Sequence, residues 1–233
     1  MNVLVTAGNT QTPIDKVRCI TNVFTGRTGG TIAAHAFDQG HRVTILTSHP
    51  EVLHALPAAR PREGPEWDVR KYRTFDDLER LMAEAIPTGG YDAIIHAAAV
   101  SDYKLAGLFT DSATPLVDAQ DGKIQGAHPE LWLKLIPTPK LVDKIRTVWG
   151  FNGILVKFKL EVGLSESVLE SIAEKARIHS DADLLVANTL EGMHDWALIG
   201  NAEGYQRHSR SELAPVLLEK VNRLAEKRSP KGL

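Results

Sequence analysis

Short apolar segments alternate with segments of helical composition through the first hundred residues. Strands are predicted at 2–7, 41–48 and 91–100, and helices at 29–40 and 74–86. Strands that are apolar on both faces are typical of a parallel sheet covered by helices on both sides. The alternation therefore predicts an α/β fold, a Rossmann-like, doubly wound and mostly parallel sheet with right-handed crossovers.

The same alternation resumes in the second half of the chain. Strands are predicted at 153–162 and 182–188, with a helix at 166–180 between them. A hairpin around 196–209 and a final helix at 211–227 complete the pattern. Ligands of such sheets bind at the carboxyl ends of the strands, so informative residues are expected directly after each strand.

Residues 104–140 break the pattern, because glycine and proline are frequent there and periodic apolar residues are few. Such a segment inside a compact domain is typically functional or disordered, and we predict an irregular insertion that acts as a lid or a dimerisation element. The 233 residues suit one domain. Residues 1–103 are expected to form its ligand-binding βαβ part, and residues 141–233 the remaining sheet and the C-terminal helix.

Charge and cysteine content narrow the class of protein. The formal net charge is −2, so nothing indicates a nucleic acid or an anionic membrane as partner. Cys19 is the single cysteine, which excludes an intramolecular disulfide, and the nine histidines show no metal-ligand spacing. The N-terminus lacks a signal-peptide pattern, and no apolar run is long enough to span a bilayer. A soluble cytoplasmic protein without a protein-bound metal is predicted.

The turn after the first strand is the segment richest in candidate ligand contacts. Residues 15–30, "DKVRCITNVFTGRTGG", match neither the dinucleotide-binding pattern GxGxxG nor the P-loop. Gly26 and Gly29 would let a ligand approach the backbone, and N–H groups at the start of a helix bind anions. The alternative is that the glycines only allow the helix to pack closely on the strand.

Three polar residues stand where a ligand site is expected, and each has a simpler alternative role. Asn22 could bind a carboxylate or phosphate through its amide, or form a local Asx turn. Asp102 follows the third strand, where it could contact a ligand or cap a helix. Lys123 lies in the insertion and could close over phosphates, although most loop lysines are simply solvated.

Further candidates lie in the second half of the chain. Lys175 and His179 are four residues apart, on one face of the predicted helix. Together they could reach a polyphosphate, or they could form an ordinary solvent-exposed face. Asn188 ends its predicted strand on the ligand side.

Six segments occur in the order found in one enzyme family. They are "VLVTAGNTQTPIDKVRCITNVFTGRTGG", "HAAAVSDY", "GKI", "TPKL", "VKFKLE" and "ADLLVANTL". From about Val3 to Asn188 the chain therefore resembles phosphopantothenate–cysteine ligases. These are stand-alone enzymes or the synthetase half of the bacterial coenzyme A (DNA/pantothenate metabolism) flavoprotein. The pieces "AAAVSDY" and "FKLE" are similar to the stand-alone members.

The resemblance implies a nucleotide-dependent ligase of coenzyme A biosynthesis. Its members activate the carboxylate of 4′-phosphopantothenate with CTP or ATP, release pyrophosphate, and form an acyl-nucleotide intermediate that the amine of L-cysteine attacks. Mg²⁺ is implied as the charge partner of the triphosphate, and a homodimer as the assembly. The chain begins at the synthetase strand, without the flavin-containing decarboxylase domain, so no bound flavin is expected.

The resemblance also implies roles for individual residues. Asn22 matches the asparagine that contacts the reacting carboxylate or acyl phosphate, and Lys123 matches the lysine of the family's flexible loop, so both are expected to be catalytic. The residues that match the nucleotide site are Gly8, Phe24, Gly26, Gly29, Phe158, Lys175, His179 and Asn188. Those that match the pantothenate site, across a dimer interface, are Ala98, Ala99 and Asp102, together with Asn22.

Four positions depart from the family pattern. Asn9 replaces a glycine, and Phe24 replaces a serine. Lys157 replaces the glycine before the family's phenylalanine, and it is expected to put a cation beside the base pocket. His179 replaces the second of two helix lysines, so its charge would depend on pH. The preference between CTP and ATP stays open.

Two other functions stay open on the residues alone. An NAD(P)-dependent Rossmann oxidoreductase or epimerase would share the βαβ start, but it requires a glycine fingerprint after the first strand and an acidic residue after the second. The chain has "AGNTQTP" and "LTSHP" at these places. A non-catalytic relative that binds nucleotide or phosphopantothenate as a regulator would keep the same motifs.

Overall fold

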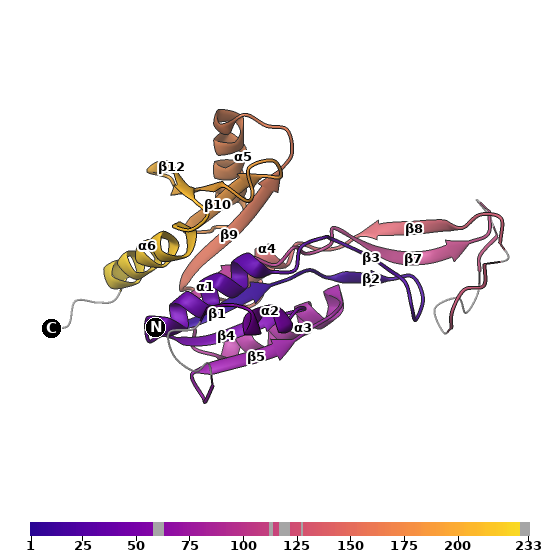
Figure 1. Ribbon diagram of the computed structural model, residues 1–233, viewed down its shortest axis with the longest axis horizontal. Coiled ribbons are helices and arrows are strands. Elements are labelled where there is room, and N and C mark those ends of the chain that lie inside the picture. The colour runs from indigo at the N-terminus through magenta and orange to yellow at the C-terminus, as the bar shows by residue number, and fades with distance from the viewer. Residues whose placement is uncertain (58–62, 112–113, 117–121, 127, 229–233) are drawn as a thin grey trace.

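The fold is described from a computed structural model, which covers residues 1–57, 63–111, 114–116, 122–126 and 128–228. Its centre is an eight-stranded sheet of order β12-β11-β10-β9-β6-β1-β4-β5 (Figure 1). Six neighbouring strands run parallel, and β11 and β12 are antiparallel. The strands are β1 Asn2–Ala7, β4 Arg42–Thr47, β5 Trp67–Lys71, β6 Ala93–His96, β9 Ile154–Glu161, β10 Leu184–Thr189, β11 Trp196–Asn201 and β12 Gly204–Ser209. The predicted mostly parallel sheet and the C-terminal hairpin are confirmed.

Helices cover both faces of the sheet, as a doubly wound fold requires. Successive side chains of a strand point to opposite faces, so Val3 and Val5 pack on one side and Leu4 on the other. The first side, called here the α1 face, is covered by α1 Arg27–Asp38, α2 Glu51–His54 and α6 Leu213–Arg228. The second, the α3 face, is covered by α3 Phe75–Thr88, α4 Leu141–Thr147 and α5 Glu166–His179.

The strand order changes direction beside β1. The chain leaves β1 for β4 and β5 on one side of it, and then returns to β6 on the other side. The carboxyl ends of β1 and β6 therefore flank a topological switch point, which is where open α/β sheets bind ligands.

Two antiparallel ribbons extend from this edge and form an arm (Figure 1). One pairs β2 Gln11–Pro13 with β3 Cys19–Thr21, and the other pairs β7 Tyr103–Phe109 with β8 Trp132–Pro137. The insertion at 104–140 was predicted to be irregular, but much of its described part is this second ribbon. All six residues of β8 are exposed, so this strand has no buried face to produce an alternating pattern.

Signals in the local sequence mark the start of some helices and strands but not of others. Thr74 is the N-cap of α3, because its hydroxyl accepts a bond of 3.2 Å from Asp77 N and the Asp77 carboxylate accepts one of 2.9 Å from Thr74 N. The short strand β5 and the helix α4 were not predicted. β5 follows a proline-rich stretch at 57–67, of which residues 58–62 lie outside the described residues.

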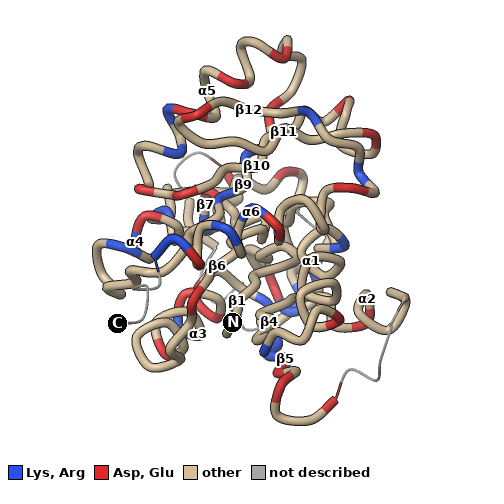
Figure 2. The backbone as a smooth tube through the Cα atoms, turned by 90° about the vertical axis from the view of Figure 1, so that its left-hand side faces the viewer, with Lys and Arg blue, Asp and Glu red and all other residues tan. Residues whose placement is uncertain are grey.

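Basic and acidic residues are interspersed along the backbone (Figure 2). Within the described ranges, no helix combines the length and the apolar character needed to cross a bilayer.

Candidate functional site

The end of β1 and the start of α1 are in direct backbone contact. Gly8 and Gly26 have positive φ angles of 93° and 80°. A Cβ atom on Gly26 would lie 2.1 Å from Gly8 N, and one on Gly29 would lie 2.8 Å from the Ala7 Cβ. The glycines are therefore required for close packing, as the simpler alternative proposed. That packing also brings the start of α1 to the switch point.

The N-terminus of α1 carries uncompensated positive character. Gly26 is its N-cap, no side chain caps the helix, and its first turn holds no acidic residue. The first N–H groups of a helix lack partners within the helix and attract anions. The arrangement therefore fits a phosphate at this edge of the sheet.

Asn22 lies where β3 returns to the sheet. Its Nδ2 donates to the carbonyl oxygen of Ala99 at 3.1 Å, a contact between segments 77 residues apart. This contact disfavours a merely local Asx turn, the alternative left open above. One hydrogen of the amide group serves Ala99, so the second can serve a ligand.

Asn9, which the resemblance implies stands in place of a glycine, has a positioning role. Its Nδ2 donates to the backbone oxygen of Asn22 at 2.5 Å. Its backbone N donates to Ser48 Oγ at 2.9 Å, at the end of β4. Asn9 is itself buried. It therefore ties the Asn22 backbone to the ends of two strands.

A buried hydroxyl–imidazole pair orders the segment after β6. Thr6 Oγ1 lies 2.9 Å from His96 Nδ1 and accepts a bond of 3.2 Å from Ala98 N. Burial lowers the pKa of His96 to about 4, so the imidazole is neutral at physiological pH. The segment that presents Ala98 and Ala99 is thereby held against β1.

Asp102 forms an ion pair with Lys140, which lies in the "TPKL" segment. Both side chains are more than half exposed, with 63% and 59% of their surface accessible. The Asp102 backbone oxygen also accepts a bond of 2.9 Å from Thr138 N. The carboxylate is thus neither a helix cap nor buried, and its contact with a substrate stays a prediction.

Phe158 and Asn188 share the α1 face, whereas Lys157 does not. Phe158 packs against the cluster that contains α1 and α6, and Asn188 has the same strand parity as the buried residues of β10 on that side. Lys157 Nζ donates to Ala176 O at 3.0 Å and to Ser180 Oγ at 2.6 Å, on the α3 face. The expectation that Lys157 would place a cation beside the base pocket is therefore wrong, because adjacent strand residues point to opposite faces.

The helix α5 that carries Lys175 and His179 also covers the α3 face. Lys175 is exposed, and His179 Nε2 lies 3.3 Å from Asp143 Oδ2 of α4. The structure thus brings Gly8, Gly26, Gly29, Asn22 and Ala99 together. It places the two α5 residues on the opposite side of the sheet, and their nucleotide role stays a prediction.

Lys123 is held beside the turn between β2 and β3. The Asp15 side chain is fully buried there and accepts bonds from Arg18 Nε at 3.0 Å and Ile124 N at 3.1 Å. Arg18 Nη2 donates to Ile124 O at 2.9 Å, and Lys16 N donates to Gly122 O at 3.1 Å. We call this set of bonds the Asp15 latch. It fixes the backbone on both sides of Lys123.

Replacing Asp15 with asparagine is expected to open the latch, because an amide cannot accept from all of these donors. The Arg18 guanidinium holds the pKa of the Asp15 carboxyl well below its ordinary value, so the group is charged at neutral pH. We expect hydrogen exchange at Ile124 N to accelerate by about tenfold or more, with little change in the sheet. Asp76→Asn, at an exposed carboxyl of α3, is the control. Unchanged protection of Ile124 in Asp15→Asn would contradict the latch.

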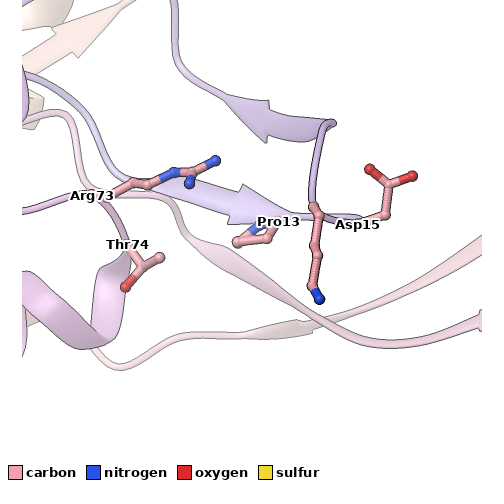
Figure 3. A pocket seen from close by; sticks show the side chains of 5 residues that line it. Pro13, Asp15, Arg73 and Thr74 are labelled. Carbon is pink, nitrogen blue, oxygen red and sulfur yellow. The ribbon is translucent and has the colours of Figure 1, made fainter. Parts of the chain in front are cut away.

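A cavity of about 290 Å³ lies between this hairpin and the start of α3. It is lined by Pro13, Asp15, Lys16, Arg73 and Thr74, and Asp15 and Arg73 extend in different directions (Figure 3). Arg73 Nε donates to Gln11 Oε1 at 2.7 Å. This lining contains none of the residues predicted for the nucleotide site, so the cavity is separate from the switch point.

Comparison with known proteins identifies the family. The family described as the DNA/pantothenate metabolism flavoprotein C-terminal domain matches residues 1–223. The chain belongs to this family. The predicted resemblance to the synthetase half of the coenzyme A flavoprotein is therefore confirmed.

Individual relatives support the same family assignment. The coenzyme A biosynthesis bifunctional protein CoaBC of Thermococcus kodakarensis is 32% identical over 228 residues, which are 95% of this chain and 51% of that protein. The chain thus spans about half the length of curated relatives that it matches. A solved structure, the DNA/pantothenate metabolism flavoprotein of Streptococcus pneumoniae, is 30% identical with a TM-score of 0.79, and the match covers 96% of this chain and 99% of that one.

A more distant structure shows the shared fold. A mutant of Cab2, described as a complex with phosphopantothenate-cysteine, is 18% identical with a TM-score of 0.74. The match covers 98% of this chain and 88% of that chain.

Several residues that shape the site were not found from the sequence. Asn9 was noted only as a departure, and the Thr6–His96 pair was not noted. Tyr72, which is buried, donates from its hydroxyl to Ala7 O at 2.7 Å. This bond lies beside the backbone contact of Gly8 with Gly26, called here the glycine turn. These contacts join separate strands and helices, so no local pattern marks them.

Proposed function

We propose that the chain is a phosphopantothenate–cysteine ligase that joins 4′-phosphopantothenate to L-cysteine with CTP or ATP. One observation carries the proposal. In a chain of this family, the Asn22 side chain and the Gly8–Gly26 backbone contact both lie at the switch point. A carboxylate can lie beside the Asn22 amide while phosphates face the start of α1.

The proposed reaction has two steps. In the first, a carboxylate oxygen of 4′-phosphopantothenate attacks the α-phosphorus, and the bond to pyrophosphate breaks. In the second, the amine of cysteine attacks the acyl carbon, the nucleoside monophosphate leaves, and the amine loses a proton. Both steps need two anions held together and the developing charge stabilised, which positioned amides and cations provide.

The residues take the following roles in this proposal. Asn22 orients the carboxylate and then the acyl phosphate, and Lys123 stabilises charge during turnover of the intermediate. Gly8, Phe24, Gly26, Gly29, Phe158 and Asn188 would surround the nucleotide, with Lys175 and His179 nearer its periphery. Ala98, Ala99 and Asp102 would contact the pantothenate portion.

Mg²⁺ would enter with the nucleotide. Within the described residues, no group of three or more His, Cys, Asp and Glu side chains could hold a metal ion. Magnesium typically binds through substrate phosphates with few protein carboxylates. The lack of a carboxylate cluster among the described residues is therefore compatible with an ion carried by the triphosphate. When bound, it would neutralise charge on the phosphates.

We also propose a homodimer that forms through the arm. Several large apolar side chains of the arm are exposed, between 37% and 53%, namely Tyr103, Trp132, Leu133, Leu135 and Ile136. Exposed apolar side chains in this number, on both faces of the ribbon, are typical of a protein interface. Lys123 and Asn22 lie at opposite ends of the β2–β3 hairpin, so a second copy would also offer a way to bring them to one site.

Sedimentation equilibrium should give twice the chain mass of 25.5 kDa, and a monomer at micromolar concentration would contradict the dimer.

The function is tested by incubating the protein with 4′-phosphopantothenate, cysteine, Mg²⁺ and either CTP or ATP, and measuring pyrophosphate. We expect release that requires 4′-phosphopantothenate, and only a single stoichiometric burst when cysteine is omitted. No release with either nucleotide would overturn the proposal. Tight NAD binding in its place would favour the oxidoreductase, and nucleotide binding without turnover would favour a regulatory relative. A yellow flavin spectrum would contradict the expected absence of flavin.

A further inference from the structure

Arg210 lies at the carboxyl edge of the sheet, although it is distant in sequence from the glycine turn. It directly follows β12, whose last residue, Ser209, pairs with Trp196 of β11. The Arg210 backbone N donates to Asp195 O at 2.9 Å. Because β11 is antiparallel to β10, its first residues lie beside the carboxyl end of β10. Arg210 is therefore on the edge where ligands of this fold bind.

The Arg210 guanidinium reaches the first turn of α1. Its Nη2 donates to the hydroxyl of Thr28, two residues after the N-cap Gly26. The residue is partly buried, and this burial lowers the pKa of the guanidinium. Across the described ranges, no carboxylate lies within 4 Å of it. A partly desolvated cation is thus placed beside the positive end of a helix.

A second helix begins close to Arg210. α6 starts at Leu213, three residues after Arg210, and packs against α1. Glu212 directly precedes it, and its carboxylate accepts bonds from the backbone N and the hydroxyl of Ser209, so the positive end of α6 has an acidic residue beside it. The N-terminus of α1 has no acidic residue in its first turn and no side-chain cap. Burying a cation without a counter-charge is costly, and the positive end of α1 increases that cost. A bound anion would offset it. An arginine fork also matches phosphate oxygens well.

The position of Arg210 agrees with the rest of the proposed nucleotide site. α1 and α6 cover the α1 face, which Phe158 and Asn188 share. The cations that the family resemblance suggests, on α5, belong to the opposite face. Arg210 therefore brings a guanidinium from the C-terminal segment to the first turn of α1, which itself begins with the exposed Arg27.

We propose that Arg210 binds the phosphates of the nucleoside triphosphate, so that the C-terminal segment forms part of the nucleotide site. This inference rests on the proposed function. The competing explanation is structural, namely that the Arg210–Thr28 bond only joins α1 to the start of α6.

Binding and kinetics separate the two explanations. Affinity for inorganic tripolyphosphate, CTP and ATP should be measured by calorimetry for the wild type, Arg210→Gln and Arg210→Lys. We expect Arg210→Gln to weaken tripolyphosphate and nucleotide binding by 10- to 100-fold, and Arg210→Lys to weaken it less. In the ligase assay, KM for the nucleotide should rise while KM for 4′-phosphopantothenate and for cysteine changes by less than about twofold.

Arg223→Gln is the matched control, because Arg223 is exposed on α6 and pairs only with Glu219 one turn away in the described structure. Lower thermal stability of Arg210→Gln with unchanged affinity would show a structural role and overturn the inference. So would a wild type that binds neither tripolyphosphate nor nucleotide. If the wild type binds tripolyphosphate but catalyses no ligation, the proposed function fails while the binding data still test Arg210.

Discussion

Asn22→Ala is expected to lower the rate of nucleotide-dependent pyrophosphate release by about two to three orders of magnitude. The amide stands between the glycine turn and the segment after β6, where the reacting carboxylate is proposed to lie. Alanine removes the donor to the developing charge and leaves the backbone in place, since Asn9 holds the backbone oxygen of residue 22. The loss should therefore fall mainly on kcat and much less on nucleotide affinity.

Stability measurements separate this effect from unfolding. Asn22→Ala removes one bond to Ala99, which is worth about 1 kcal/mol of unfolding free energy. A matched control is Asn152→Ala, in an exposed turn before β9, which should keep wild-type activity. Wild-type kcat in Asn22→Ala would remove this residue from the mechanism, and a large drop in melting temperature would show that its role is structural.

Among substitutions in the glycine turn, Gly26→Ala is expected to lower the free energy of unfolding the most. The added Cβ would lie 2.1 Å from Gly8 N and 2.6 Å from Gly8 Cα, and both are backbone atoms that cannot rotate away. Relief requires α1 to move off β1. We expect a loss of more than about 4 kcal/mol of unfolding free energy, or failure to fold, together with loss of nucleotide binding in any folded fraction.

Gly40→Ala is the control that isolates the close approach. Gly40 also has a positive φ, 86°, but a Cβ there meets no atom within 4 Å. Its substitution should cost only about 1–2 kcal/mol, the penalty of a left-handed backbone. Denaturant unfolding of both variants gives the comparison. Equal losses for Gly26→Ala and Gly40→Ala would mean that the backbone contact contributes nothing beyond the φ angle.

The sheet could be predicted from the sequence because its strands are buried. β1, β4 and β10 are apolar and end at polar or glycine residues, so length and composition mark them. The arm could not be predicted in the same way. β8 is exposed along its whole length and β2 has only three residues, so neither produces a period of two in apolar residues.

Some residues of the candidate site could likewise be predicted from the sequence, and others could not. Asn22 and Gly26 were expected to be functional from the order of the family motifs, and the structure brings both to the switch point. Lys157 was misplaced because its neighbour Phe158 was assigned to the base pocket without regard to strand parity. Arg210 was overlooked because nothing in its local sequence indicates that it reaches Thr28, 182 residues away.

Local composition and motif order were thus sufficient for the mostly parallel sheet, the family and the glycine turn, since strand burial and glycine geometry are properties of short segments. Which face each side chain occupies, which cation reaches the start of α1, and how the Asp15 latch holds Lys123 were decided by tertiary structure. These depend on strand register and helix packing between segments far apart in the chain, and the contacts that determine them exist only after the chain has folded.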